Sequence, residues 1–581
     1  MKKILLPALL ALAIANAPGM AQAQTVCPAT SSNVVSVGTG TPAKAGLDIT
    51  TNTTWTRNNI YLLNGTVYVN SGVTLTIEAG TIIKGDKTNQ GTLVIRQGGK
   101  LNAIGTPTQP IVFTSNQPAG SRAPGDWGGV IICGRAPVNL PGNPTIEGGV
   151  VANFGGTDPA DNSGTLQYVR IEFPGVNFDV NNEINGLTLG GVGYGTTLDH
   201  IQVTASNDDS FEWFGGTVNA KYLIGLAGTD DDFDTDNGFS GRVQFGLALR
   251  DPSRGDFASG GVSNGFESDN DATGTANTPQ TSAVFSNMTI LLPMTTTPAS
   301  PFTASSAALV RRNSAISIFN TVLAGRRYGL ELNSNSGNLT TASAASGSLG
   351  FANNVLASYG PLPSRAARVT SNSGATAGFN INTFVGANSD TTRTVAALGL
   401  NADNFAFEGN CGNNKACVPA FNLPAASLLN TGAAFASTKL TGAGNGGPNS
   451  TFDVVTYRGA FGTTNWASGW TNFNPQITCY NVAGQTLANR EVANAPLQAL
   501  TVSPNPTEGA ATLGFDVKTA TTATVRVFDV MGREVATVLA AGKLSAGPQR
   551  LALPANLAPG VYVATVATPG AVQSVRFVVA Q

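Results

Sequence analysis

Carboxylate side chains recur at regular spacing in the middle of the chain, and their type and spacing could do chemistry. Three segments align around a phenylalanine: Asp208-Asp209-Ser210-Phe211-Glu212, Asp230-Asp231-Asp232-Phe233-Asp234 and Asn264-Gly265-Phe266-Glu267. The phenylalanines are 22 and 33 residues apart, which fits one coil of a repeat and one coil with an insertion. If the segments stack, Glu212, Asp234 and Glu267 lie roughly 5 Å apart. Like charges repel at that distance, so the stack requires a cation, a proton or a basic side chain.

Calcium is the cation that these segments favour. Asp232, Asp234 and Asp236 occupy every second position, so an extended strand presents them on one face, and Glu267 and Asp269 repeat the pattern. Calcium takes about six to eight oxygen ligands at about 2.3–2.6 Å, which such faces offer. The predicted ligands are Glu212, Asp232, Asp234, Asp236, Glu267 and Asp269. Solvated acidic turns and a catalytic acid cluster are the two alternatives.

A complete catalytic set is not evident. Asp208 and Asp209 could pair as a general acid and a base that activates water. His200 is the only histidine, which excludes a two-histidine zinc site. A lone histidine in a strand-like run is typical of a structural residue. We expect no organic cofactor.

The elements that position these residues are short β-strands. From about residue 61 the chain cycles through apolar–polar alternating runs separated by Gly, Asn, Asp and Thr turns. Ile201, Tyr222 and Val243 are 21 residues apart, and a recurrence of 20–30 residues is typical of a solenoid. The pattern predicts an all-β parallel β-helix over residues 61–490, preceded by a lead-in or cap at 24–60. An array of β-sandwich domains is the alternative.

Residues 73–85, 99–106, 110–115 and 125–132 resemble the opening coils of right-handed parallel β-helix proteins secreted by bacteria. That group includes polysaccharide lyases, glycosidases and adhesins, so the resemblance indicates the fold and leaves the activity open. Calcium-dependent lyases with this fold use an Arg or Lys base. The resemblance therefore makes Lys221 and Arg242, which are 21 residues apart, candidate bases beside the acidic coils.

The N-terminus has the features of an export signal. Lys2 and Lys3 precede an apolar run over residues 4–15, and Ala21-Gln22-Ala23 fits the small-x-small cleavage rule, so residues 1–23 are predicted to be a signal peptide. The run is too short to span a bilayer, and we expect no transmembrane segment in the mature chain.

Export permits disulfides. Cys411 and Cys417 lie close together in a Gly/Asn-rich loop and are the leading candidate pair, and Cys27 with Cys479 is a further one. Cys133 lies in an apolar run and is predicted to be a buried free thiol.

A separate C-terminal domain follows a linker at residues 491–499. Residues 500–581 contain about seven short alternating strands, which predict a small immunoglobulin-like β-sandwich. This domain resembles the C-terminal sorting domain of the type IX secretion system, through motifs that occur in the same order: Pro504-Asn505-Pro506, Asp529 with Gly532-Arg533, and Pro559-Gly560-Val561-Tyr562. The resemblance implies the type IX machinery as a partner, followed by release or attachment to surface lipopolysaccharide.

Charge content narrows the function further. Only 11% of the 581 residues are charged and the net charge is −2, which argues against a nucleic-acid partner. The leading hypothesis is a secreted or outer-membrane-attached protein whose β-helix is a non-catalytic surface, adhesion or glycan-binding module, stabilised by a cation. The alternative is a calcium-dependent polysaccharide lyase, or a glycoside hydrolase, acting on an acidic polysaccharide.

Overall fold

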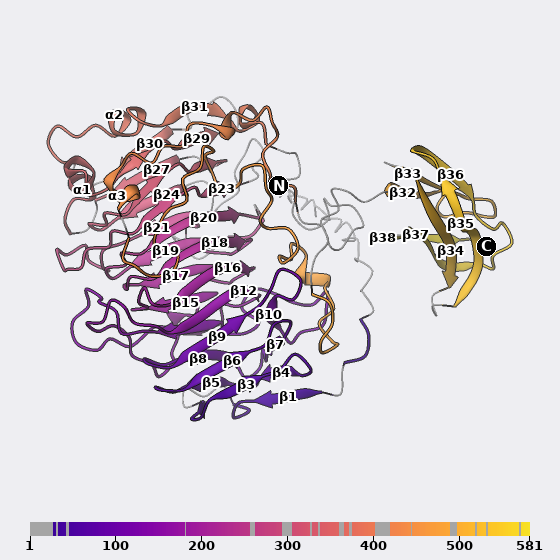
Figure 1. The fold of residues 1–581 in the computed structure, drawn as a ribbon, viewed down its shortest axis with the longest axis horizontal. Helices are drawn as coiled ribbons and strands as arrows, with labels where there is room; N and C mark the ends of the chain where they lie inside the picture. Colours follow the sequence, from indigo (N-terminus) through magenta and orange to yellow (C-terminus); the bar gives the residue numbers. More distant parts are fainter. Residues whose placement is uncertain are drawn as a thin grey trace, which may run out of the picture.

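The structure is a computed structural model in which stacked coils form a right-handed parallel β-helix, followed by a small β-sandwich (Figure 1). This all-β architecture confirms the predicted fold class. The structure describes residues 27–580 except for 31–32, 42–45, 180–181, 252, 256–261, 293–304, 326–327, 335–336, 359–364, 371–374, 401–418, 443, 488–496, 518–519, 530–532 and 569–570. The predicted signal peptide, the Cys411–Cys417 pair, most of the linker and Gly532 lie outside the described residues.

Each coil contributes strands to three parallel ladders, which the chain visits in the order third, second, first. The third ladder consists of β2 (Leu47–Ile49), β5 (Thr66–Val69), β8 (Thr92–Ile95), β11 (Val130–Cys133), β15 (Leu187–Gly190), β17 (Phe211–Phe214), β19 (Phe233–Asp236), β21 (Phe266–Ser268), β24 (Ser306–Arg311), β27 (Tyr328–Asn333) and β30 (Arg365–Thr370).

The other two ladders share four long strands in the middle coils, which are β12 (Gly164–Glu172), β16 (Thr197–Thr204), β18 (Asn219–Leu226) and β20 (Arg242–Leu249). The second ladder adds β3 (Thr53–Trp55), β6 (Thr74–Ile77), β9 (Lys100–Ile104), β22 (Val284–Ser286), β25 (Ser317–Phe319) and β28 (Phe351–Ala352). The first ladder adds β1 (Val34–Val37), β4 (Ile60–Leu63), β7 (Ile82–Gly85), β10 (Ile111–Ser115), β23 (Thr289–Leu291), β26 (Val322–Ala324), β29 (Val355–Ser358) and β31 (Asp390–Thr394).

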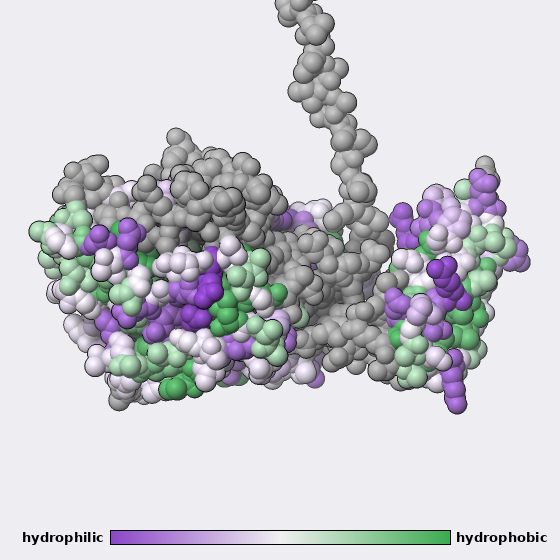
Figure 2. Space-filling model, turned by 90° about the horizontal axis from the view of Figure 1, so that it is seen from above, coloured by the Kyte–Doolittle hydropathy of each residue, from purple (hydrophilic) through white to green (hydrophobic). Residues whose placement is uncertain are grey.

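Period-2 alternation explains the core, because every second side chain of a strand points into the coil. Vertical register then places like residues on one another, as in the inward column of the third ladder. Its members are Val67, Leu93, Val130, Leu187, Phe211, Phe233, Phe266, Ala308 and Leu330, and all are buried. Outside, the coloured surface in Figure 2 is a mosaic of hydrophilic, pale and hydrophobic residues, as the low charge content implies.

A left-handed backbone residue makes the corner between the second and first ladders. Residues at this corner have φ between 51° and 62° and are Tyr168, His200, Tyr222, Phe245, Asn287, Asn320 and Asn353. Asparagine tolerates this conformation better than most residues. The aromatic members instead stack, with ring centroids 4.4 Å apart for Tyr168–His200 and 4.3 Å for His200–Tyr222. His200 is thus a structural residue of the corner.

The parallel ladders begin and end earlier than the sequence predicted. β1 already pairs with β4, so the first coil lies within the predicted lead-in at 24–60, and β31 is the last described strand of the ladders. Residues 419–487, described except for residue 443, form no further coil. They form a return segment of turns and short helices: η3 (Leu428–Asn430), α3 (Thr438–Thr441) and η4 (Pro475–Ile477).

Residues 440–442 and 444–453 of the return segment pack against the second ladder, and from Tyr457 the segment runs back along the first ladder towards the N-terminal coils. Asn287 donates to the carbonyl of Tyr457, Gln202 to that of Asn472, and Arg122 to that of Thr478, in coils of decreasing residue number. A disulfide joins Cys27 to Cys479, which confirms that candidate pair. The segment covers outward apolar residues of the first ladder with Phe421, Phe461, Trp470 and Phe473.

Short elements decorate the coils: the hairpin β13 (Asn177–Asp179) and β14 (Asn182–Glu183), the helices α1 (Thr340–Ser346) and α2 (Ile381–Gly386), and the turn η1 (Val395–Leu398). In the described part of the chain, no helix is long and apolar enough to cross a membrane.

The C-terminal domain is an immunoglobulin-like sandwich of two antiparallel sheets. One sheet contains β32 (Leu497–Ser503), β33 (Thr512–Val517) and β36 (Gly547–Ala552), and the other β35 (Glu534–Leu544), β34 (Thr521–Asp529), β37 (Gly560–Thr568) and β38 (Ala571–Val579). The sheets enclose a core of their own, which includes Leu513, Val525, Ala564 and Phe577.

Candidate functional site

The acidic segments stack in the register that their spacing predicts. Phe211 pairs with Phe233 and Phe233 with Phe266 across the third ladder, with ring centroids 5.7 and 5.5 Å apart. On the opposite side of the same strands, Glu212 pairs with Asp234, and Asp234 with Glu267. Successive side chains of a strand point to opposite faces, so the phenylalanine rings fill the core while the adjacent carboxylates face outwards.

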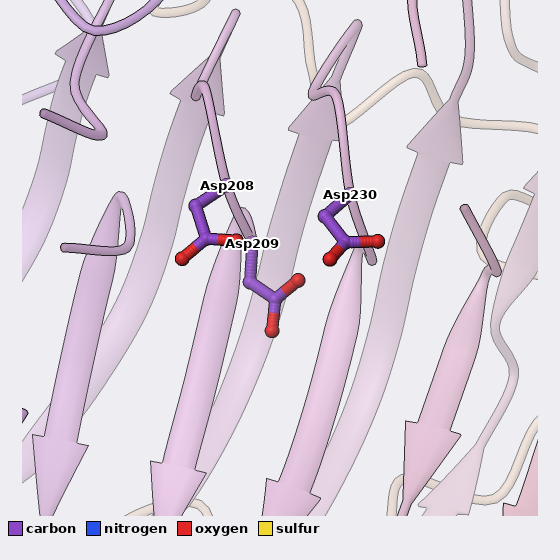
Figure 3. Close-up of side chains that lie close together, drawn as sticks. All are labelled: Asp208, Asp209 and Asp230. Atoms are coloured by element: carbon purple, nitrogen blue, oxygen red, sulfur yellow. The ribbon is translucent and has the colours of Figure 1, made fainter. Parts of the chain in front are cut away.

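Two overlapping groups of carboxylates form where the first ladder turns into the third. Asp208, Asp209 and Asp230 each offer an oxygen within 4.8 Å of the others, and so do Asp209, Glu212 and Asp234. Figure 3 shows Asp208 and Asp209 on one turn and Asp230 on the next, each leading into a neighbouring strand. Asp209 belongs to both groups, so the five residues form one continuous acidic cluster.

Polar neighbours hold the acidic cluster in place. The Asn185 side chain donates to Glu212 and, at 2.9 Å, to Glu147, while its oxygen accepts from the Asp209 backbone. The Asp231 backbone N–H donates to Asp209 Oδ1 at 2.7 Å. Sequence reasoning missed Glu147 because it lies in the long insertion between β11 and β12, which carries no repeat spacing. It missed Asn185 because an amide there takes the place that Asp209 occupies in the next coil.

Burial and mutual repulsion perturb the cluster. Desolvation, followed by the charges of neighbouring acids, raises the pKa of Asp208, Asp209 and Glu212 well above the usual range. Asp234 has its pKa raised in the same way, and nearby Arg311 opposes this only in part. Within the described residues, no lysine or arginine forms an ion pair with any of these four carboxylates.

The acids of the next coil, which contains β21, are neutralised by arginines from the coil of β24. Arg311 forms ion pairs with Glu267 and Asp269, and Arg312 pairs with Asp269. Asp236 lies outside both carboxylate groups, and burial followed by repulsion from Asp269 raises its pKa to about 7. Of the predicted calcium ligands, the structure therefore brings together only Glu212 and Asp234 in the cluster, with Asp208, Asp209 and Asp230 added.

Asp232 does not share a face with Asp234 and Asp236, contrary to the sequence prediction. β19 begins at Phe233, so Asp232 belongs to the preceding turn, where strand alternation does not apply. Its carboxylate is fully buried and forms an ion pair with buried Arg250 at 2.8 Å. A buried charge requires such a partner, and Arg250 supplies it.

The donor set of the cluster fits a hard divalent cation. Carboxylate oxygens are the ligands that calcium prefers, and the cluster offers them from two adjacent coils. Asp234 Oδ1 is buried and accepts no hydrogen bond from the described residues, so it retains a lone pair for a ligand beside Asp209 and Glu212. Glu147 lies next to Glu212 through the shared Asn185 amide and adds a further carboxylate.

Comparison with known proteins places the whole coil region in one family. A family model described as a pectate-lyase-like β-helix domain matches residues 47–471, which is most of the chain. The chain belongs to this family. A second model, a secretion-system C-terminal sorting domain, matches residues 501–580. No curated protein and no solved structure matches the chain.

The protein is therefore a type IX-sorted, pectate-lyase-like β-helix that is secreted or carried at the cell surface. In the sorting domain, the motif residues Asp529 and Arg533 form an ion pair at 3.0 Å that closes the turn between β34 and β35. Tyr562 donates its hydroxyl to the Ala558 carbonyl at 2.8 Å. Pro504, Asn505 and Pro506 follow β32, and Asn505 Oδ1 accepts from the Val578 backbone. Pro559 and Gly560 lie at the start of β37.

The candidate bases lie away from the acidic cluster in this pectate-lyase-like β-helix. Lys221 and Arg242 are on the second ladder, whereas the cluster is beside the third. Lys221 forms an ion pair with Asp453 of the return segment, and Arg242 donates to the Gly442 and Ser450 carbonyls. The 21-residue spacing correctly predicted that Lys221 and Arg242 lie in consecutive coils. It could not predict that they lie on the second ladder, away from the cluster.

Proposed function

We propose that the acidic cluster binds calcium and that the β-helix is a non-catalytic, cation-stabilised surface module that binds glycans. The observation that carries the proposal is the pair of carboxylate groups sharing Asp209, where no lysine or arginine of the described residues pairs with Asp208, Asp209, Glu212 or Asp234. Several buried like charges are unstable without compensation, and a divalent ion compensates them most directly.

The cation would join coils that otherwise repel. Asp208, Asp209 and Glu212 belong to one coil, and Asp230 and Asp234 to the next. An ion between them turns the repulsion into a cross-link, and Glu147 extends it to the insertion before β12. Arg311 supports this reading, because it compensates Glu267 and Asp269 in the following coil, where a cation is therefore not needed.

Thermal unfolding of the full chain in calcium and in chelator tests the cation. When the free concentration of a ligand is 100 times its Kd, and only the folded state binds it, the folded protein is stabilised by about 2.7 kcal/mol. We therefore expect a higher Tm in calcium. Asp209→Asn, which removes a carboxylate from both groups, should abolish most of that difference. Asp161→Asn is the matched control, since Asp161 is also buried, with 6% exposure, but outside the cluster. Equal Tm values for the wild-type protein in both buffers would contradict the proposal.

Incubation with acidic polysaccharides in calcium tests the non-catalytic part. We expect saturable binding without product, because the candidate bases Lys221 and Arg242 are engaged elsewhere. Release of unsaturated sugars, followed by ultraviolet absorbance, would instead establish the lyase alternative. New reducing ends without that absorbance would establish the hydrolase.

A further inference from the structure

A second polar site lies far from the acidic cluster, at the N-terminal end of the first ladder. A cavity of about 180 Å³ opens between β1, β4, β7 and the return segment. Its polar lining comes from Thr30, Lys84, Asn116, Gln117 and Asn481. The volume greatly exceeds the roughly 10–15 Å³ that one water requires, so the cavity has room for a small ligand.

Lys84 is the charged group of this cavity. It points outwards from the first ladder between Leu62 and Thr114 and is only 7% exposed. Its ammonium group donates to Asn481 Oδ1 at 3.1 Å, whereas a lysine has three protons to donate. Among the described residues, no carboxylate forms an ion pair with Lys84.

The surroundings of Lys84 carry an excess of buried positive charge. Arg122 is 5% exposed and donates to the backbone carbonyls of Gln117, Pro475 and Thr478, so it also lacks an ion pair in the described part of the chain.

The nearby carboxylates are already engaged. Asp126 pairs with Lys87 at 2.9 Å, and Glu172 lies 3.6 Å from Arg170 while accepting from Thr114 and Tyr480. The charges of Lys84 and Arg122 are therefore not balanced by the neighbouring acids.

We propose that this cavity binds one small oxyanion, anchored by the ammonium group of Lys84. A buried cation is costly unless an opposite charge accompanies it, and the cavity leaves space for that charge beside Lys84. Thr30, Asn116 and Gln117 supply hydroxyl and amide donors for the remaining oxygens. The amide of Asn481 donates to the Pro28 carbonyl, which holds its oxygen towards Lys84.

Calorimetric titration of the full chain with sulfate and, separately, with acetate tests the proposal. We expect saturable binding at one site for at least one probe. Sulfate alone indicates a tetrahedral oxyanion, and acetate alone indicates a carboxylate. Lys84→Met should weaken binding at least tenfold. Lys100→Met is the matched control, because Lys100 lies at the same end of the β-helix but on β9 of the second ladder.

A second variant tests the site while keeping Lys84 in place. Asn481→Asp places a carboxylate at the position of the amide oxygen that lies 3.1 Å from Lys84 Nζ. This internal anion should raise the Tm and abolish binding of the probe. The proposal is overturned if the wild-type protein binds neither sulfate nor acetate, or if either variant binds the probe as tightly as the wild type does.

Discussion

Burial changes the chemistry of single ionisable side chains in this β-helix. Lys84 and Cys133 are both strand residues. Lys84 is almost completely buried, and Cys133 is fully buried. Desolvation, with a smaller contribution from Arg122, lowers the pKa of Lys84 to about 8. Desolvation also raises the pKa of the Cys133 thiol to about 12. Each shift has a measurable consequence.

Stability should depend on pH through Lys84. Its pKa is about 8 in the folded state against the ordinary 10.5, so between these pH values the unfolded chain binds more protons than the folded one. The free energy of unfolding should therefore rise as pH increases from 8 to 10.5. This lowering of the Lys84 pKa corresponds to a rise of roughly 3 kcal/mol in the free energy of unfolding. Denaturant unfolding at several pH values, without added oxyanion, measures this rise. Arg122 faces the same site but stays charged in that range. Lys84→Met should remove the rise, and parallel curves for the two proteins would contradict this origin.

Cys133 should be inert in the native protein. Its sulfur is fully buried on β11, which confirms the prediction of a buried free thiol, and only the thiolate reacts with disulfide reagents. In a Cys411→Ser/Cys417→Ser background at pH 8, we expect a colorimetric thiol reagent to detect Cys133 only after denaturant is added. Rapid labelling of the folded protein would show that this coil opens locally.

Residue spacing predicted the core better than it predicted charge pairing. Phe211, Phe233 and Phe266 stack as expected, because a repeat fixes which residues share a column. The partner of Asp232 could not be found this way, because Arg250 follows β20 whereas Asp232 precedes β19, and these strands belong to different ladders. Ion pairs across a coil depend on side-chain direction at the corners, which spacing does not specify.

Among the elements, the return segment has the largest effect on the surface of the β-helix. It covers the outward side of the first ladder, and Trp470 is the largest of its buried rings, with 1% exposure. The ring lies edge-on to Tyr168 and His200 of the corner stack. Its indole N–H donates to the Trp466 carbonyl at 2.8 Å. The segment is thus attached to the coils through an aromatic contact with the corner.

Trp470→Ala should lower the free energy of unfolding by about 3–5 kcal/mol, the usual cost of removing a large buried ring. Val454→Ala in the same segment is the control, because Val454 is 79% exposed and should change stability little. Chemical denaturation of both variants measures the difference. Equal effects would mean that the segment lies on the coils without stabilising them.

The sequence did not predict the return segment. Residues 419–487 contain no recurrent spacing, and their attachment to the coils includes hydrogen bonds from distant side chains such as Gln202 and Gln244. Contacts of that kind have no local signature. The coils themselves were predictable, since each repeats the alternation and turn residues of its neighbours.

At the scale of the whole molecule, the described residues form two separate hydrophobic cores, so we expect the β-helix and the sandwich to unfold as separate units. The β-helix core and the sandwich core share no residue, and the strands of each pair only among themselves. The two-part architecture and the sorting domain were predictable because repeats and ordered motifs are local signals. The Cys27–Cys479 disulfide closes almost the entire β-helix into one loop, and such cross-links stabilise by about 2–5 kcal/mol.

Calorimetry should show two unfolding transitions, one for each unit. The double variant Cys27→Ser/Cys479→Ser should lower the Tm of the β-helix transition only. The cross-link restricts the unfolded chain of that unit and leaves the sandwich unaffected. Cys133→Ser, which changes a thiol outside the disulfide, controls for the loss of sulfur. A shift of both transitions would show that the two units unfold together.

The same disulfide has a mechanical consequence. A force applied between the chain before Cys27 and the chain after Cys479 passes through the S–S bond and bypasses residues 28–478. If the molecule is tethered and pulled, the disulfide carries the force and the coils do not. In the oxidised protein, the coils would bear no load and could not be peeled apart from either terminus.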